Sequence, residues 1–436
     1  MRIASLVGRA CLRKIARFAS HPTIGAEMKL LFANDRINNA TAKIGFFTML
    51  LASTFPGVAL SDEPYSAPEA NSAPPSGLHP YGIIDGGVRH IDLVSPLGAT
   101  TQFTSGLNTS RFGVLGSEIV SSDLQATLRL ESGFNSGTGA SANSTSLFDR
   151  TADVGLRWRW LDVKAGRMEG FGYELAGSGV TDPLAMALNL PNYSSPAAAG
   201  SKAPVLGANP LQAVYSYTYG QLRFNNAVRL STETGNWSAG VIYSFGGVAG
   251  DFSDDSVRAG HLGWHLGQTG GLDAIVQQSL DLSGNRSTLY VLAGSWNVSA
   301  FRLQAGFHQI RIGAGFDSAG LGNGASTSGI LGNSTTVSTV LATAKENFRF
   351  QVADLGATWT VAPGRLLTLA AYKSETQGAG QGDSLALVAL GKWFLSPRVA
   401  LYLEADHDNS SGRLAIKPVS GASIATAYMT GINLHF

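Results

Sequence analysis

The last twelve residues, 425–436, alternate between apolar side chains and small or polar ones. Successive side chains of a β-strand point to opposite faces, so this alternation predicts a strand with one mostly apolar face. That face would carry Thr426, Tyr428, Thr430, Ile432, Leu434 and Phe436, and the other face Ala427, Met429, Gly431, Asn433 and His435. The pattern recurs about sixteen times from residue 81 onward. So long a sheet is best satisfied by closing into a transmembrane barrel, apolar outside and polar inside.

The pattern places sixteen antiparallel strands in an all-β fold. They are 81–92, 110–119, 124–133, 148–160, 161–169, 220–231, 236–246, 256–267, 271–280, 286–296, 299–312, 348–361, 364–374, 384–395, 397–406 and 423–436. Connections after odd-numbered strands are mostly long, as at 93–109, 134–147, 170–219, 313–347 and 407–422. Connections after even-numbered strands are short, as at Ser121–Asp123. Long loops on one rim and tight turns on the other are typical of an outer-membrane barrel, whereas a Greek-key sandwich would not keep that order.

The tryptophans indicate the same orientation. On this strand assignment all seven fall near the short turns, and tryptophan prefers the interface between a bilayer and water. In the core of a soluble sheet they would be scattered over both ends. We therefore expect a periplasmic aromatic girdle made of Trp158, Trp160, Trp237, Trp264, Trp296, Trp359, Trp393 and Phe436.

Charged residues confined to one parity of a strand predict a water-filled interior. The lumen-facing residues expected outside the narrowest part are Arg129, Glu131, Arg157, Arg229 and Glu404. On 222–230 the alternation places Phe224 on the lipid side. Residues 385–390 are apolar on both parities, a pattern that also fits a contact between subunits.

Composition excludes several classes of protein. Charged residues are 14% of the chain, against roughly 25% in ordinary soluble domains, and 53 of 436 residues are glycine. Residues 62–436 carry 23 basic and 28 acidic residues, so nothing here resembles a nucleic-acid-binding surface. The single cysteine, Cys11, excludes a disulfide framework and a cysteine metal site.

Residues 1–61 have the features of a secretory signal peptide with a long front end. The apolar run 44–55 follows basic residues and is too short to cross a bilayer as a helix. Small residues at Ala59 and Ser61 precede the expected cut. The leader is either genuinely extended or begins at Met28, which we favour. An N-terminal membrane anchor is a third interpretation.

Residues 62–80 contain five prolines. Proline cannot donate to a β-ladder, so this stretch is expected to be an extended linker. The barrel domain would then occupy 81–436.

From residue 81 the chain resembles the general porins of Gram-negative bacteria, especially those of β-proteobacteria. The resemblance rests on the order and spacing of short motifs: YGIIDGGV at 81–88, SRFGVLGSE at 110–118, LESGFN at 130–135, LFDRTADVGL at 147–156, FNNAVRL at 224–230, YSFGGVAGDFS at 243–253 and the terminal Phe436. It implies a homotrimer of 16-stranded barrels in outer-membrane lipid. Each barrel would hold its own pore, narrowed by a third long loop that folds inward.

By position, residues 170–219 are that constriction loop. The resemblance implies loop acids set against a ladder of wall arginines, an arrangement that selects ions and orients dipolar solutes. The matching arginines are Arg111, Arg150 and Arg223, and the available acids are Glu169, Glu174 and Asp182.

Two departures from the family pattern bear on this loop. It has few carboxylates and an apolar run at 183–190, and Arg150 shares the parity of lipid-facing Val154. Arg150 would need a bulge or the end of the strand to point inward. Basic residues of the wall outnumber the acids of the loop, so we expect a preference for anions. These basic residues are Arg129, Arg157, Arg159, Lys164 and Arg229. The alternative is that these are ordinary solvated lumen residues.

Other groupings have simpler explanations than catalysis or metal binding. Residues 382–385 match a lipase tetrad with His407 downstream, but no helix follows the serine. His261 and His265 share a strand face, which predicts a polar lumen pair more readily than a metal site. The aspartates at 251, 254 and 255 fit a solvated loop better than a cation site, and glycine-rich 313–333 fits a surface loop.

The sequence therefore predicts a passive outer-membrane channel for small hydrophilic solutes and ions. No catalytic residue, cofactor, metal or nucleic-acid partner is expected. A substrate-specific channel is the main alternative, and an adhesin or a barrel enzyme comes after it.

Overall fold

The computed structural model describes residues 76–93, 99–142, 146–178, 223–316, 347–378, 381–412 and 424–436. Regular structure in these ranges is β, apart from the helix α4 (Phe171–Ser178) and the turn η2 (Gly267–Thr269). The strands are β1 (Gly77–Leu93), β2 (Ala99–Thr104), β3 (Arg111–Ser121), β4 (Leu124–Gly133), β5 (Thr151–Trp158), β6 (Leu161–Glu169), β7 (Arg223–Thr234), β8 (Trp237–Ser244), β9 (Val257–His265), β10 (Gly270–Leu280), β11 (Arg286–Val298), β12 (Phe301–Ile312), β13 (Phe348–Ala362), β14 (Arg365–Gly378), β15 (Gly382–Ser396), β16 (Val399–Gly412) and β17 (Ile424–His435). No described helix is both long and apolar enough to cross a membrane.

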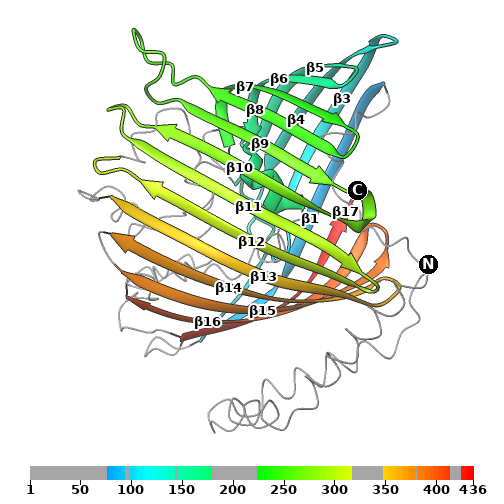
Figure 1. Cartoon of the computed structure of the whole chain (residues 1–436). Helices are drawn as coiled ribbons and strands as arrows, with labels where there is room; N and C mark the ends of the chain where they lie inside the picture. Colours follow the sequence, from blue (N-terminus) through cyan, green and yellow to red (C-terminus); the bar gives the residue numbers. More distant parts are fainter. Residues whose placement is uncertain are drawn as a thin grey trace, which may run out of the picture. The chain divides into compact units, whose positions relative to one another are not determined.

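The strands form one antiparallel sheet that closes on itself (Figure 1). Each strand from β3 to β17 pairs with the next, and β17 returns to β1 in a register that runs from Ile83↔His435 to Leu93↔Ala425. The other edge of β1 pairs with β2 and then with β3, so those two segments are one interrupted strand. The predicted barrel of sixteen antiparallel strands is confirmed.

Strand boundaries and connector lengths follow the sequence pattern closely. Six turns on one rim have two residues each, at 122–123, 159–160, 235–236, 299–300, 363–364 and 397–398. The other rim carries the long connections, although three of its connections are short, at 94–98, 281–285 and 379–381. Most of the expected leader and linker lies outside the described residues.

β1 begins four residues before the expected start of the barrel and includes Pro80. Gly82 exchanges backbone hydrogen bonds with Phe436, so its polar groups face β17. Those of Pro80 point the same way, because backbone groups alternate along a strand. The backbone groups of Pro80 lie beyond the end of β17. No partner strand is present there, so the N–H that proline lacks is not needed for the ladder.

Residues 105–110, here named the inner segment, interrupt the β2–β3 strand and project into the barrel. Most of 93–109 was expected to be an external loop, and for the part from residue 99 this is wrong. Leu107 packs against inward-facing Leu390, Tyr402 and Met429.

Asp85 holds the inner segment from β1. Its backbone oxygen accepts hydrogen bonds from the hydroxyls of Ser105 (3.2 Å) and Ser110 (3.0 Å), and its carboxylate accepts one from the Gly106 N–H. The same carboxylate accepts hydrogen bonds from the Tyr402 hydroxyl (3.0 Å) and the Asn433 amide (2.7 Å). One buried acid therefore links β1, β16, β17 and the inner segment.

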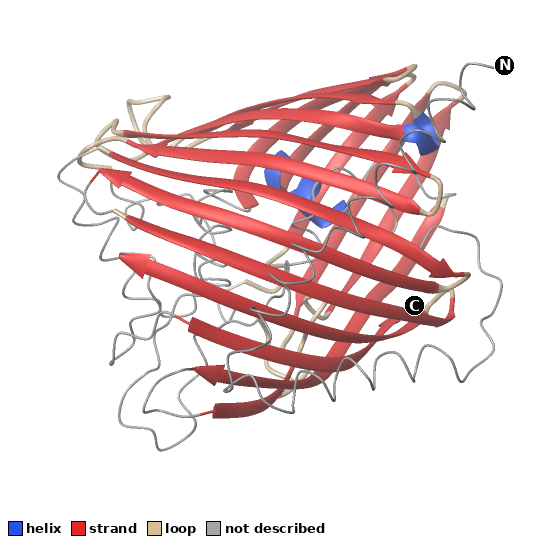
Figure 2. Ribbon diagram, turned by 60° about the horizontal axis from the view of Figure 1, so that its bottom comes forward, coloured by secondary structure: helices blue, strands red, loops and turns tan. Residues whose placement is uncertain are grey.

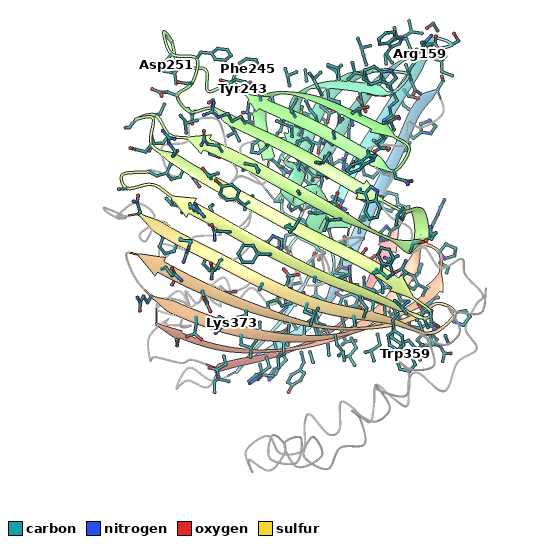
Figure 3. The ribbon with its side chains drawn as sticks, viewed as in Figure 1. Arg159, Tyr243, Phe245, Asp251, Trp359 and Lys373 are labelled. Carbon is teal, nitrogen blue, oxygen red and sulfur yellow. The ribbon has the colours of Figure 1, made fainter. Side chains whose placement is uncertain are left out.

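The outer surface is apolar along most of its height, and the tryptophans gather at one rim. All seven lie in or beside the short turns, as the sequence predicted. Trp158, Trp160, Trp237, Trp296 and Trp359 are exposed there, as is Phe436. In Figure 3, Trp359 and Arg159 mark the short-turn rim, whereas Asp251 marks the long-connection rim.

The interior is less polar than the alternation suggested. On β13 and β15 the inward side chains include Phe350, Val352, Val388 and Leu390, all of them buried. Residues 385–390 are therefore apolar on both parities because this part of the interior is apolar.

Phe224 faces inward, which corrects the expectation that it faces lipid. Asn226 adopts a positive φ of 48°, and the β6–β7 register shifts between Gly166 and Met168. A bulge of this kind reverses which parity points inward. Phe224 consequently packs inside with Met168 and Phe171.

Replacing Asp85 with alanine should lower the free energy of unfolding by about 3 kcal/mol, because several buried donors lose their acceptor. Guanidinium unfolding of the barrel in detergent measures this change. Asp123→Ala is the matched control, because that turn carboxylate is half exposed and should matter by less than about 0.5 kcal/mol. Equal midpoints for the two variants would show that Asp85 does not hold the inner segment.

Candidate functional site

A cluster of charged side chains lies on the inner wall formed by β3 to β7. Its members, here named the lumenal cluster, are Arg111, Arg129, Arg150, Arg223, Arg229, Glu131, Glu169 and Glu174. Apart from Asp182, which lies outside the described residues, it contains every residue expected at the constriction.

Glu131 of β4 is the centre of the lumenal cluster and is fully buried. Its carboxylate lies 3.1 Å from an Arg129 nitrogen and 3.6 Å from Arg111 Nε, and it also pairs with Arg150. The Tyr81 hydroxyl donates a further hydrogen bond of 2.7 Å to it. Three cations and a hydroxyl around one carboxylate satisfy its charge and its lone pairs, which a buried ion requires.

Arg150 joins this centre to the neighbouring strands. It precedes the first residue of β5, so the end of the strand lets it point inward despite its parity. Its side chain reaches Glu131 on one side and Glu169 on the other, the latter at 3.4 Å. Glu169 in turn lies 2.9 Å from Arg223 at the start of β7. A continuous chain of ion pairs therefore crosses four strands.

The helix α4 packs inside the barrel against the inner wall, as Figure 2 shows. Its first residue, Phe171, lies beside the inward-facing His261, with the two rings tilted by 32° and their centroids 5.4 Å apart. Phe171 also fills the space beside Gly240 of β8, where a larger residue would collide with it. α4 thus brings Tyr173 and Glu174 to the arginines of the wall.

Two aromatic rings of α4 support guanidinium groups. Arg229 lies 4.6 Å from the centre of the Phe171 ring and pairs with Glu174. Arg223 lies 4.6 Å from the centre of the Tyr173 ring, whose hydroxyl is 3.4 Å from Arg150. Cation–π contacts are strongest where the cation is shielded from water, as it is here.

The wall of the lumenal cluster is positive. Five arginines and three glutamates leave an excess of two positive charges. In the ring of sixteen, β13 lies eight strands from β5, and its inward residues are mostly neutral. Asp354, the charged one among them, lies 3.0 Å from His308. The described part of the lumen is therefore electrically asymmetric.

The described acids contact the arginines directly. The resemblance implied acids facing arginines across an opening, but Glu169 and Glu174 are ion-paired with the wall itself. Charge separation across the lumen thus comes from the uneven distribution of arginines rather than from opposed rows.

Several predicted residues lie elsewhere. Arg157 faces inward nearer the short turns and pairs with Asp162 at 3.0 Å. Arg159 was expected on the inner wall, but it occupies the exposed turn after β5 and pairs with Asp123. Glu404 is buried and faces inward on β16, which is three strands from β3 across the closure of the barrel, and it has no ion pair with the lumenal cluster among the described residues.

The other candidate groupings resolve into hydrogen-bonded structure. His261 and His265 both face inward and share the carboxylate of Asp273, with contacts of 2.8 and 3.0 Å. Within the described ranges, no three His, Cys, Asp or Glu side chains are placed to hold a metal ion. Ser384 faces inward and His407 outward, so the lipase-like tetrad cannot form a catalytic pair.

The aspartate loop is also structural. Asp251 accepts hydrogen bonds from the backbone N–H groups of Asp254 (2.9 Å) and Ser253 (2.7 Å). These hydrogen bonds hold the pKa of Asp251 below its usual range. The carboxylate therefore serves as a turn cap.

Sequence reasoning missed the roles of Tyr81, Phe171 and Asp85. Tyr81 and Asp85 are both on the inward-facing parity of β1. An acidic residue on that parity was the feature of the sequence that could have identified Asp85. Their partners on β4, β16 and β17 depend on the register of strands far apart in sequence. α4 was hidden within a connection rich in glycine, proline and alanine.

A profile of the Gram-negative porin family matches residues 48–413, which is most of the chain. The chain belongs to the Gram-negative porins. This porin is therefore an outer-membrane protein, and its family and fold are those of a channel rather than of an enzyme. An outer membrane porin protein of Bordetella pertussis is 30% identical over 196 residues. That alignment covers 41% of this porin and 44% of the relative, less than half of either.

Solved structures share the fold. An anion-selective porin from Comamonas acidovorans aligns with a TM-score of 0.59 at 17% identity, covering 83% of this porin and all of that chain. A trimer form of OmpT from Vibrio cholerae aligns with a TM-score of 0.54 at 11% identity, covering 83% of this porin and 99% of that chain. At such identities the likeness concerns the barrel alone.

Glu131→Gln should destabilise the porin by about 3–5 kcal/mol, because it leaves buried guanidinium groups without their carboxylate. Unfolding in detergent measures the loss, with exposed Glu118→Gln as the control. Adding Arg150→Met to Glu131→Gln removes one uncompensated charge and should recover part of the stability. A double variant no more stable than Glu131→Gln would contradict the assigned pairing.

The Tyr173 hydroxyl should ionise at a lower pH than an ordinary tyrosine. Burial alone would raise its pKa, but the positive charges of Arg150 and Arg223 outweigh burial and lower the pKa to about 8. Tyrosinate absorbance in the near ultraviolet should show a rise with that midpoint. This one step should be missing from the titration of Tyr173→Phe. Arg223→Gln should move the midpoint upward, because one stabilising cation is lost. An unchanged midpoint in Arg223→Gln would show that the arginine does not act on the phenol.

Proposed function

We propose that this porin forms a passive pore for small hydrophilic solutes and ions, with a preference for anions. The observation that carries the preference is the positive excess of the lumenal cluster on one wall. Fixed positive charge at a low-dielectric wall raises the local concentration of anions and lowers that of cations.

The charges next to the lumenal cluster do not offset this excess. Asp153, Arg157, Asp162 and Lys164 face inward on β5 and β6 and cancel one another in number. The anion selectivity of the Comamonas porin of the same fold is consistent with the proposal.

The proposed assembly is a homotrimer embedded in outer-membrane lipid. The exposed outer face is apolar and the tryptophans form a band at the short-turn rim, as a periplasmic girdle would. The trimeric form of a structure with the same fold supports the oligomer.

A substrate-specific channel is the second candidate, and the apolar interior favours it. Phe171, Leu175 and Phe224 of α4 and β7 form an inner apolar cluster with Ile242 of β8. The inner segment adds Leu107 elsewhere on the wall. A specific channel would show small conductance steps that its substrate blocks, whereas a general pore shows large steps that do not saturate.

Opposite charge changes at one ion pair should shift selectivity in opposite directions. Arg229→Gln removes a positive charge and should reduce anion preference, whereas Glu174→Gln removes a negative charge and should increase it. The measurement is the reversal potential across a planar bilayer in a potassium chloride gradient. Arg159→Gln, in an exposed turn, serves as the control with no expected shift.

The wild-type reversal potential tests the proposal itself. Clear cation preference would refute the role assigned to the lumenal cluster. Absence of any channel activity would refute the pore.

A further inference from the structure

The inner segment has more residues than its place in the sheet requires. Before it, Thr104 pairs with Gly87 of β1, and after it, Arg111 pairs with Ile83 on the same edge. The six residues of the segment therefore stand opposite only three residues of β1, 84–86. Three residues would be enough to continue a regular strand, so the extra length has to leave the wall.

The inner segment has one side on the wall and one side towards the interior of the barrel. Gly106 and Leu107 are buried. A side chain at position 106 would collide with the Tyr402 hydroxyl, so glycine allows the backbone to lie directly on the wall. The polar residues Asn108 and Thr109 are only half-buried. The segment therefore presents polar groups to the interior.

Hydrogen bonds from several directions fix the inner segment in place. Besides the contacts with Asp85, the Arg89 guanidinium donates a hydrogen bond of 3.2 Å to the backbone oxygen of Ser105. The Ser105 hydroxyl lies 3.2 Å from that of Ser136, in the connection after β4. Together with the packing of Leu107, these contacts make the segment a fixed part of the inner surface.

The inner segment and α4 lie on opposite walls. Phe171 of α4 lies beside His261 of β9 and fills the space at Gly240 of β8. On the other side, Leu107 packs against Tyr402 of β16 and Met429 of β17. In the ring of sixteen, β17 is eight strands from β9 in either direction. Two elements therefore extend inward from opposite sides of the barrel.

The two elements also lie at similar heights. Leu390 and Met429, which contact Leu107, are each six residues from the short-turn ends of β15 and β17. Ile275, in the apolar cluster with Phe171, is five residues from the short-turn end of β10. One residue of a strand corresponds to a rise of about 3.4 Å, so the two contact levels nearly coincide.

The lumenal cluster lies between these two elements along the ring. Its central strand, β5, is four strands from β9 and four strands from β17. Arg111 follows the inner segment directly and belongs to the lumenal cluster. The positive wall therefore begins where the inner segment ends.

We propose that the inner segment is a second constriction element and that it sets the size limit of the passage jointly with α4. This inference rests on the proposed pore. A solute drawn towards the arginines passes between α4 and the polar side of the inner segment. The width of a pore and the hydrogen-bonding groups that line it determine which solutes enter. Because the segment is held by many contacts, it narrows the passage permanently and does not act as a gate.

Deletion of residues 106–108 tests the proposal. It leaves three residues opposite 84–86, so the strand can continue without a projection, and Thr104 and Arg111 keep their pairing with β1. The single-channel conductance of the full-length porin in planar bilayers should rise at least about 1.5-fold, because the passage is wider. Larger polyethylene glycols should also enter the pore. The sign of the reversal potential should stay the same, since the arginines remain.

A substitution at Asn108 should change the pore in the opposite direction. Asn108→Trp enlarges the half-buried polar side of the segment and leaves the Leu107 packing intact, so conductance should fall and smaller polyethylene glycols should be excluded. Ser283→Trp is the matched control. It adds the same side chain to an exposed turn between β10 and β11 and should conduct as wild type does. Heat-modifiable migration on gels shows whether each variant is folded.

Two results would overturn the proposal. The first is wild-type conductance and a wild-type polymer cut-off in Asn108→Trp, which decides the question alone if the deletion variant does not fold. The second is a changed reversal potential with an unchanged polymer cut-off in the deletion variant, which would limit the segment to positioning Arg111. A wild-type chain that conducts no ions would instead refute the proposed pore, so the two failures are distinguishable.

Discussion

The structure depends on the closure of its sheet. In hydrocarbon no water is available for backbone groups, so an unpaired strand edge would cost several kcal/mol for each exposed N–H or C=O. Pairing of β17 with β1 removes both edges at once, and the reciprocal bonds between Gly82 and Phe436 extend the ladder to the last residue. The Phe436 ring occupies the space where a side chain at position 82 would stand, so the glycine and the terminal aromatic fit together. Alternation of side chains then divides the molecule into a lipid face and an inner face.

Because the sheet is closed, charged side chains on its inner face are partly shielded from water and need partners of opposite charge. A guanidinium shielded from water is tolerated when a carboxylate and further hydrogen bonds surround it. Glu131, Glu169 and Glu174 serve this purpose for five arginines, and the rings of α4 support two of them. The arginines and the glutamates of the lumenal cluster lie on the same side of the barrel. The excess of two positive charges therefore also lies on that side. A channel whose field is built in this way holds its charged side chains rigidly, since most of them contact two or more partners.

The barrel could be predicted from the sequence because the features that specify it lie within single strands and the connectors between them. Alternation along each strand and the lengths of successive connectors indicate the number and orientation of the strands. The positions of the tryptophans indicate the short-turn rim. Features that depend on register between distant strands could not be predicted. The Tyr81 hydroxyl that donates to Glu131 comes from β1, and partners of Asp85 lie on β16 and β17. A bulge beside Asn226 reverses Phe224 without any clear sign in its alternation. The burial of Phe350 and Leu390 inside the barrel likewise follows from what lies around the ring, not from their own strands.

The anchoring of the inner segment by Asp85 has a consequence for biogenesis. Two of the groups that hold this carboxylate belong to β16 and β17, at the far end of the chain from the inner segment, which follows β1. The junction between β1 and β17 is therefore held by side chains inside the barrel as well as by backbone hydrogen bonds. Without β16 and β17 in place, the Asp85 carboxylate lacks the Tyr402 hydroxyl and the Asn433 amide. The inner segment therefore has its full set of contacts only when β16 and β17 stand beside β1, and a barrel that is not closed would differ from the closed one in its bore as well as in its edge.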